Sequence, residues 1–257
     1  MLVLAGFATG LVVGTTGVGG GALLTPLLLL VFGIAPTVAV GTDLWFAALT
    51  KLAATRLHHA RGLIDWQVAR RLWTGSLPAS VLMLALISAS LVKIEVQMLR
   101  LLIAVAVVIT ATGLFFHQHL HALGRRLRLA DEKQFKRFQA PLTVLAGGGL
   151  GLIVTLTSVG AGALGAVMLT YLYPLRLTPS RLVATDIVHA IPLAVVSGTG
   201  HLLLGNVHFD LLGWLLLGSI PGVLLGASLS VRLPQTILRN ILAAVLLLIG
   251  IQLWWKT

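Results

Sequence analysis

The sequence predicts an all-α integral membrane protein with two inverted-topology repeats. At roughly 20 residues per span, it predicts about eight to ten membrane segments, including broken or half helices at two glycine clusters. Of the 257 residues, 58% are hydrophobic and 10% are charged, whereas a soluble domain carries about 25% charged residues. Long apolar runs alternate with short polar patches, and the second half of the chain repeats the first. This composition excludes a water-soluble globular domain and a disordered chain.

The repeat is visible at two nearly equal offsets. At an offset of 141, residues 5–23 match residues 146–164 at 11 of 19 positions. At an offset of 143, Thr42-Asp43 matches Thr185-Asp186, and a Gly-Ser-x-Pro element recurs. Similarity between unrelated apolar helices would not place these polar residues at one constant offset. The sequence therefore predicts a first repeat over 1–118, a linker over 119–139 and a second repeat over 140–257.

The charge pattern predicts the topology. The chain has 18 Lys and Arg residues against 7 Asp and Glu residues, and positively charged loops stay in the cytoplasm. We attribute this excess to topology and expect no nucleic-acid partner. The basic linker 119–139 is expected to be cytoplasmic. The clear spans are expected at 38–57, 72–92 and 96–116, and at 181–203, 211–231 and 236–255. Corresponding loops then lie on opposite faces, which is an architecture common in transporters.

Each half opens with an apolar run that a glycine cluster interrupts, at residues 14–21 and at residues 155–162. Neither arm beside a cluster is expected to reach a full span, so we interpret each opening as two half-helices, either a re-entrant hairpin or two short spans. A half-helix N-terminus carries free N–H groups and partial positive charge, which suits an anion. For Gly6, Gly10 and Gly14 we accept the alternative, close helix packing.

Four ionisable side chains fall inside the expected spans: Asp43, Lys51, Asp186 and His189. A charge buried in a bilayer is costly, so such residues usually pair or carry function. Lys51 suits anion binding, and His189 suits proton coupling. The alternatives are that the aspartates cap helices or bond to the glycine breaks, and that Lys51 neutralises Asp43 or extends to the interface.

The chain contains no cysteine, which excludes disulfides, thiol catalysis, thiolate-bound zinc and Cys-ligated iron–sulfur clusters. His117 and His121 have the spacing of a shared metal site. No carboxylate is in reach, so a solvated helix end is the interpretation we favour. We expect no metal, no cofactor and no catalytic residues.

The sequence resembles the TauE/SafE family of sulfite-exporter-like anion transporters. The resemblance rests on the glycine-rich break, on PTVAVGTDL, on His58 and Gly62 followed by Ile64-Asp65-Trp66, and on the Gly-Ser-x-Pro element. It is weaker in the second half, where His208-Phe209 replaces Asp65-Trp66. The family motif maps to Gly17, Gly19, Gly20, Gly21, Thr42 and Asp43. The resemblance implies a small anion as substrate, such as sulfite or an organosulfur anion, moved across the bacterial plasma membrane.

We therefore expect a multi-pass secondary transporter in the bacterial inner membrane, with its site where the two repeats meet. Its partners would be a small anion, the lipid bilayer and a coupling H⁺ or Na⁺. The candidate substrate-binding residues are Gly17, Gly19, Gly20, Gly21, Thr42, Lys51, Ser158, Gly160, Gly162 and Thr185. The candidate coupling residues are Asp43, Asp186 and His189. The alternatives are a membrane enzyme acting on lipid-like substrates, a passive anion channel and a structural membrane subunit.

Overall fold

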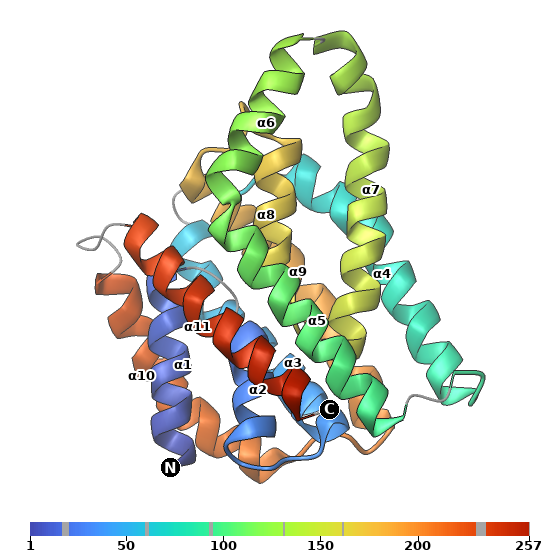
Figure 1. Ribbon diagram of the computed structural model, residues 1–257, viewed down its shortest axis with the longest axis vertical. Helices are drawn as coiled ribbons and strands as arrows, with labels where there is room; N and C mark the ends of the chain where they lie inside the picture. The colour runs from blue at the N-terminus through green and yellow to red at the C-terminus, as the bar shows by residue number, and fades with distance from the viewer. Residues whose placement is uncertain are drawn as a thin grey trace.

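The computed structural model describes residues 1–16, 21–59, 62–92, 95–130, 132–160, 162–229 and 235–256. Within these ranges every regular element is an α-helix (Figure 1). In chain order they are α1 (Leu2–Thr16), α2 (Gly21–Leu30), α3 (Pro36–His59), α4 (Trp66–Ser88), α5 (Val96–Phe115), α6 (His117–Ala130), α7 (Glu132–Thr157), α8 (Ala163–Leu172), α9 (Pro179–Leu203), α10 (Phe209–Leu229) and α11 (Gln235–Trp255). The predicted all-α class is confirmed.

Six helices in the described residues are long and apolar enough to cross a membrane. They are Trp66–Ser88, Val96–Phe115, Phe135–Thr157, Pro179–Leu203, Phe209–Leu229 and Ile237–Trp255. Five of them overlap expected spans, although α4 covers Trp66–Ser88 rather than 72–92, and its early start follows from the Asp65 side chain, which caps its N-terminus. The expected span at 38–57 lies in α3, which is helical but is not among the six.

One expectation about the second half is wrong. The arm that precedes its glycine cluster is not a short half-helix, because Phe135–Thr157 is long enough to span. The helix continues backward into the polar linker, where nothing in the sequence stops it, so α7 begins at Glu132. Together α6 and α7 form a hairpin that projects from one end of the molecule (green, Figure 1). The shorter apolar helices among the described residues are α1, α2 and α8.

Two helix pairs pack through matching sets of glycines. On α1, a Cβ added to Gly6 or Gly10 would overlap the carbonyl oxygens of Leu215 or Ser219 on α10. On α7, the corresponding Gly147 and Gly151 meet Leu72 and Ser76 of α4 in the same way. Offsets of 141 and 143 relate every member of the first set to a member of the second. The corresponding helices of the two halves thus exchange partners, and the packing interpretation of the α1 glycines is confirmed.

We predict that Gly10→Ala lowers the thermal unfolding midpoint of the detergent-solubilised protein by roughly 2–12 °C. The added methyl forces α1 away from the Ser219 carbonyl, and overpacking of this kind typically costs about 1–3 kcal/mol. Gly213→Ala on α10 is the control, since an added Cβ there meets nothing within 4 Å. An equal midpoint for both variants would show that the helices do not approach this closely.

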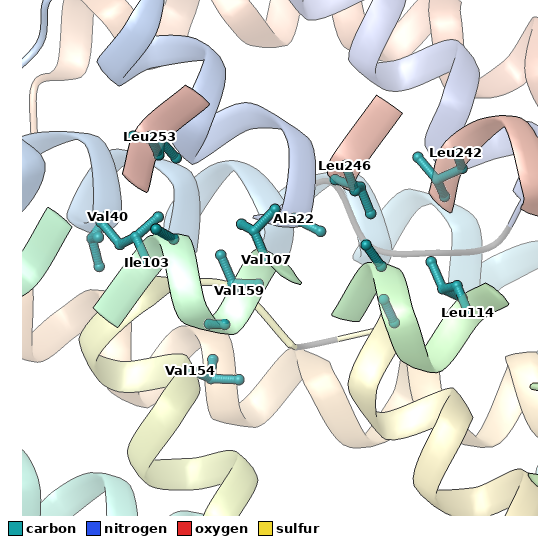
Figure 2. Close-up of a cluster of buried hydrophobic side chains, with 14 of the residues drawn as sticks. Ala22, Val40, Ile103, Val107, Leu114, Val154, Val159, Leu242, Leu246 and Leu253 are labelled. Atoms are coloured by element: carbon teal, nitrogen blue, oxygen red, sulfur yellow. The ribbon is translucent and has the colours of Figure 1, made fainter. Parts of the chain in front are cut away.

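Among the described residues, the largest apolar cluster lies beside the starts of α2 and α8. It joins α5 and α11, through residues such as Val107 and Leu246, to Ala22 in the first turn of α2 and to Val159 between α7 and α8 (Figure 2). Irregular backbone at membrane depth is tolerated only where protein or a wet cavity surrounds it. The long helices therefore provide the enclosure that the interrupted ones require.

Candidate functional site

The site is built where the start of α2 meets the end of α7. A Cβ added to Gly21, the first residue of α2, would overlap the carbonyl oxygen of Ser158 and lie 3.1 Å from its Oγ. Ser158 follows α7 with a φ of 57°, and Gly160 and Gly162 adopt φ values of 113° and 139°. Glycine tolerates such angles, so the cluster ends α7 and lets α8 start in a new direction. The predicted interruption between α7 and α8 is confirmed. Gly17, Gly19 and Gly20 lie outside the described residues.

Each half-helix is approached by the aspartate of a long helix from its own half. Thr25 on α2 donates a hydrogen bond of 2.5 Å from its Oγ1 to Oδ2 of Asp43 on α3. In the other half, Oδ1 of Asp186 on α9 packs directly against Gly165 in the first turn of α8. Both aspartates are buried. A carboxylate near a helix N-terminus is electrostatically favourable. The expected alternative, that the aspartates contact the breaks, fits Asp43, which lies close to Ser158, whereas Asp186 contacts α8 beyond the glycine cluster.

Lys51 supplies the buried positive charge between these carboxylates. It lies on α3, and only 1% of its side chain is exposed. Its ammonium is within electrostatic range of both Asp186 and Asp43, and also of His189. The Ser158 side chain lies close to the Asp43 carboxylate. The structure thus gathers Gly21, Asp43, Lys51, Ser158, Asp186 and His189 around one centre.

His189 is held by α4. Its Nε2 lies 3.0 Å from the hydroxyl oxygen of Ser76, and its backbone carbonyl accepts a hydrogen bond of 3.1 Å from the indole nitrogen of Trp73. Its Nδ1 is buried and has no hydrogen-bond partner among the described residues. One ring nitrogen is therefore fixed by a hydroxyl, while the other has no hydrogen-bond partner among the described residues.

Thr42 and Thr185 make contacts between the halves. The Thr42 hydroxyl accepts a hydrogen bond of 3.1 Å from the backbone N–H of His208, and the Thr185 hydroxyl accepts one of 3.0 Å from the backbone N–H of Asp65. The offset of 143 relates His208 to Asp65 as it relates the threonines. In this structure the two hydroxyls join long helices to loops of the opposite half. Their role in substrate binding stays a prediction.

Asp65, whose backbone N–H bonds to Thr185, also forms an ion pair through its side chain. Its Oδ2 lies 2.7 Å from Nε of Arg176 and 3.7 Å from Arg181. Burial alone would raise the pKa of Asp65, but hydrogen bonds from Arg176 and the N–H of Val68, with the positive charges of both arginines, hold that pKa below its usual value. A depressed pKa stabilises the fold above about pH 4, and this stabilisation is lost as the pH falls through the folded-state pKa.

We predict that Asp65→Asn lowers the unfolding midpoint at pH 7 by about 2–4 °C, corresponding to about 1 kcal/mol because Arg176 is partly exposed. Asparagine keeps the helix cap, so only the charge is lost. The difference between variant and parent should shrink as the pH falls below about 4. Asp210→Asn, at an exposed position, is the control. A difference that did not change with pH would exclude the charge as its cause.

Three residues of the centre were not among the predicted ones: Thr25, Gly165 and Ser76. Ser76 belongs to the repeated Gly-Ser-x-Pro element, so the repeat offered a signal for it. Thr25 and Gly165 have no such signal, because the offset of 141 pairs them with Ala166 and Leu24. Their roles depend on which side chain of the long helix reaches them, which only the packing determines.

Comparisons with known proteins agree with this architecture. The sequence model of the sulfite exporter TauE/SafE family matches residues 2–253. The probable membrane transporter protein YjnA of Bacillus subtilis is 36% identical, over 98% of this chain and 98% of its own length. The probable membrane transporter protein YdhB of the same organism is 25% identical, over 93% of this chain and 94% of its own length. No solved structure matches the chain.

Proposed function

This chain belongs to the sulfite exporter TauE/SafE family of membrane transporters, and on that premise we propose that it is a secondary transporter of a small anion. Sulfite or an organosulfur anion is the proposed substrate. It would bind between the two half-helix ends, beside Lys51. The observation that carries this proposal is the buried ammonium of Lys51, placed where the interruptions of the two halves meet.

The charges at the centre support coupling to protons. Two carboxylates, Asp43 and Asp186, face one ammonium and two half-helix N-termini. Each such terminus is equivalent to about half a positive charge, so the empty centre is close to neutral when both carboxylates are ionised. An arriving monovalent anion would add an uncompensated charge at low dielectric, where that is costly. One proton taken up by a carboxylate or by His189 removes this cost and frees a helix end for the substrate.

An inverted arrangement of the halves fits the packing. From the interruptions, α2 runs toward the start of α10, where Leu28 packs with Leu211 and Leu212. Its counterpart α8 runs toward the linker hairpin, where Gly124 of α6 meets the Tyr171 carbonyl. With the exchanged pairs α1–α10 and α4–α7, these directions support a pseudo-twofold axis through the centre. Such an axis is the usual basis of alternating access in transporters with inverted repeats.

We predict that Trp66→Cys and Phe209→Cys are labelled from opposite sides of the bacterial plasma membrane. These residues correspond at the offset of 143, begin α4 and α10, and are 45% and 63% exposed. Because the chain has no cysteine, each variant carries a single reactive thiol. A membrane-impermeant maleimide on intact cells should modify Phe209→Cys, and Trp66→Cys only after the membrane is opened. Labelling of both on intact cells would contradict inversion and the cytoplasmic linker 119–139.

The function is tested with purified protein in proteoliposomes. Uptake of labelled sulfite should accelerate when the vesicles contain unlabelled sulfite, because a carrier exchanges its substrate. A passive channel gives no such counterflow. An imposed pH gradient should drive accumulation, and for a monovalent anion the flux should be insensitive to membrane potential. No flux above that of protein-free vesicles for sulfite, thiosulfate and sulfoacetate would refute the proposal.

A further inference from the structure

A cavity lies between the centre and the linker hairpin. Its volume is about 80 Å³, and α5, α6, α8, α9 and α11 contribute to its wall. This volume holds several water molecules, and hence one small oxyanion. Its inner end is formed by Asp186, whose Oδ1 has no hydrogen-bond partner among the described residues. The cavity therefore leads from the linker side to the proposed coupling group.

Basic side chains gather at the outer part of this cavity. Arg239 on α11 is half-buried, and His117 and His121 stand one turn apart at the start of α6. Within the described ranges, Asp186 is the only carboxylate in the cavity wall, and Arg239 has no ion pair. A partly buried guanidinium without a carboxylate partner is an unbalanced charge. Such a charge attracts a mobile anion.

The histidines can respond to that anion. Burial, followed by the positive charges of Arg239 and His121, lowers the pKa of His117 to about 4, so an unoccupied cavity holds this imidazole neutral at pH 7. Nε2 of His121 lies 3.1 Å from the Pro174 carbonyl oxygen, which can only accept, so this nitrogen carries the hydrogen. A bound anion would favour protonation of the His117 ring.

We propose that this cavity, which we call the vestibule, is a second binding site for a small oxyanion, held by Arg239 with His117 and His121. Guanidinium presents planar paired donors that match two oxygens of one oxyanion. The role of the vestibule in transport rests on the proposed function, in which it would collect substrate on the linker side before Asp186 and Lys51. The oxyanion could be a free ion or the phosphate of a lipid headgroup.

The binding arm of the test does not depend on transport. Crystals of the full chain soaked in selenate should show an anomalous selenium peak in the vestibule. Arg239→Gln should abolish this peak, while Arg126→Gln, which removes an exposed charge of α6, should retain it. A peak that survives Arg239→Gln, or no peak in the parent, overturns the proposal. A lipid phosphate in the vestibule that selenate does not displace, when phosphatidylglycerol and phosphatidylcholine preparations are compared, would assign the site to a headgroup and overturn its role in collecting a free anion.

The transport arm uses proteoliposomes in which each face is supplied separately. Arg239→Gln should raise KM about 10-fold for substrate offered at the linker face, the expected effect of losing a charge-assisted hydrogen bond. Vmax and the KM at the opposite face should stay within about twofold, and Arg239→Lys should restore part of the loss. An unchanged KM at the linker face would overturn the transport role. Absence of flux in the parent would instead refute the proposed function and leave the selenate result standing.

Discussion

Replacing Lys51 by methionine is expected to reduce anion flux in proteoliposomes by at least about 100-fold. Methionine preserves most of the length of the side chain but removes its charge. Lys51 is buried between the carboxylates of the two halves, and removing one member of a buried charge group costs about 3–5 kcal/mol. An anion entering the variant would meet two carboxylates with no cation to offset them. The measurement is the initial rate of labelled sulfite uptake, compared at equal amounts of reconstituted protein.

A second variant separates binding from simple neutralisation. In Lys51→Met with Asp43→Asn, one positive and one negative charge are removed together, so the centre keeps its balance and the asparagine can still accept from Thr25. If Lys51 binds substrate, the double variant should fold, as shown by a monodisperse elution profile and a cooperative melt, and should remain inactive. Recovery of flux in the double variant would show that Lys51 only neutralises Asp43, the alternative that the sequence left open.

The interruption between α7 and α8 could be predicted because glycine clusters stand out in an apolar sequence and occur at the same place in both halves. The length of α7 could not be predicted. Apolar composition shows which residues lie in lipid, but it does not show how far the helix continues into water. The charged residues that begin α7 at Glu132 are compatible with a helix, and nothing in their pattern distinguishes a helical linker from an irregular one.

The sequence predicts which charged residues lie at the centre, but not which of them lie close to one another. Spacing along α3 suggested Asp43 as the neighbour of Lys51, whereas the fold also brings Asp186 from the opposite half into range. Thr42 and Asp43 form one motif in sequence, yet adjacent helical residues point about 100° apart. One therefore contacts the loop at His208 while the other contacts Thr25 on α2. Sequence motifs report which residues occur together, and helix geometry decides which neighbours each one meets.

The two aspartates differ in a way that the repeat conceals. Each has one oxygen, Oδ1, without a hydrogen-bond partner among the described residues, but Asp43 receives a hydrogen bond from Thr25 at Oδ2, whereas Asp186 forms the inner end of the vestibule. A proton that arrives from the linker side would therefore reach Asp186. In the proposed charge balance, protonating this carboxylate allows the centre to accept an anion without excess negative charge.

We accordingly predict that Asp186→Asn abolishes accumulation driven by a pH gradient while anion exchange continues. Asparagine is neutral, as a protonated aspartate is, so the variant can accept the anion but can release no proton. With one proton per monovalent anion, the parent should accumulate substrate up to about 10-fold per pH unit, and the variant should not exceed equilibrium. Net flux in the variant should become sensitive to membrane potential, because the anion now crosses without a compensating charge.

Asp210→Asn, at the exposed start of α10, should behave as the parent. Accumulation that persists in Asp186→Asn would move the coupling proton to Asp43 or His189, and loss of exchange together with accumulation would mean that the carboxylate holds the half-helix α8 in place through its contact with Gly165.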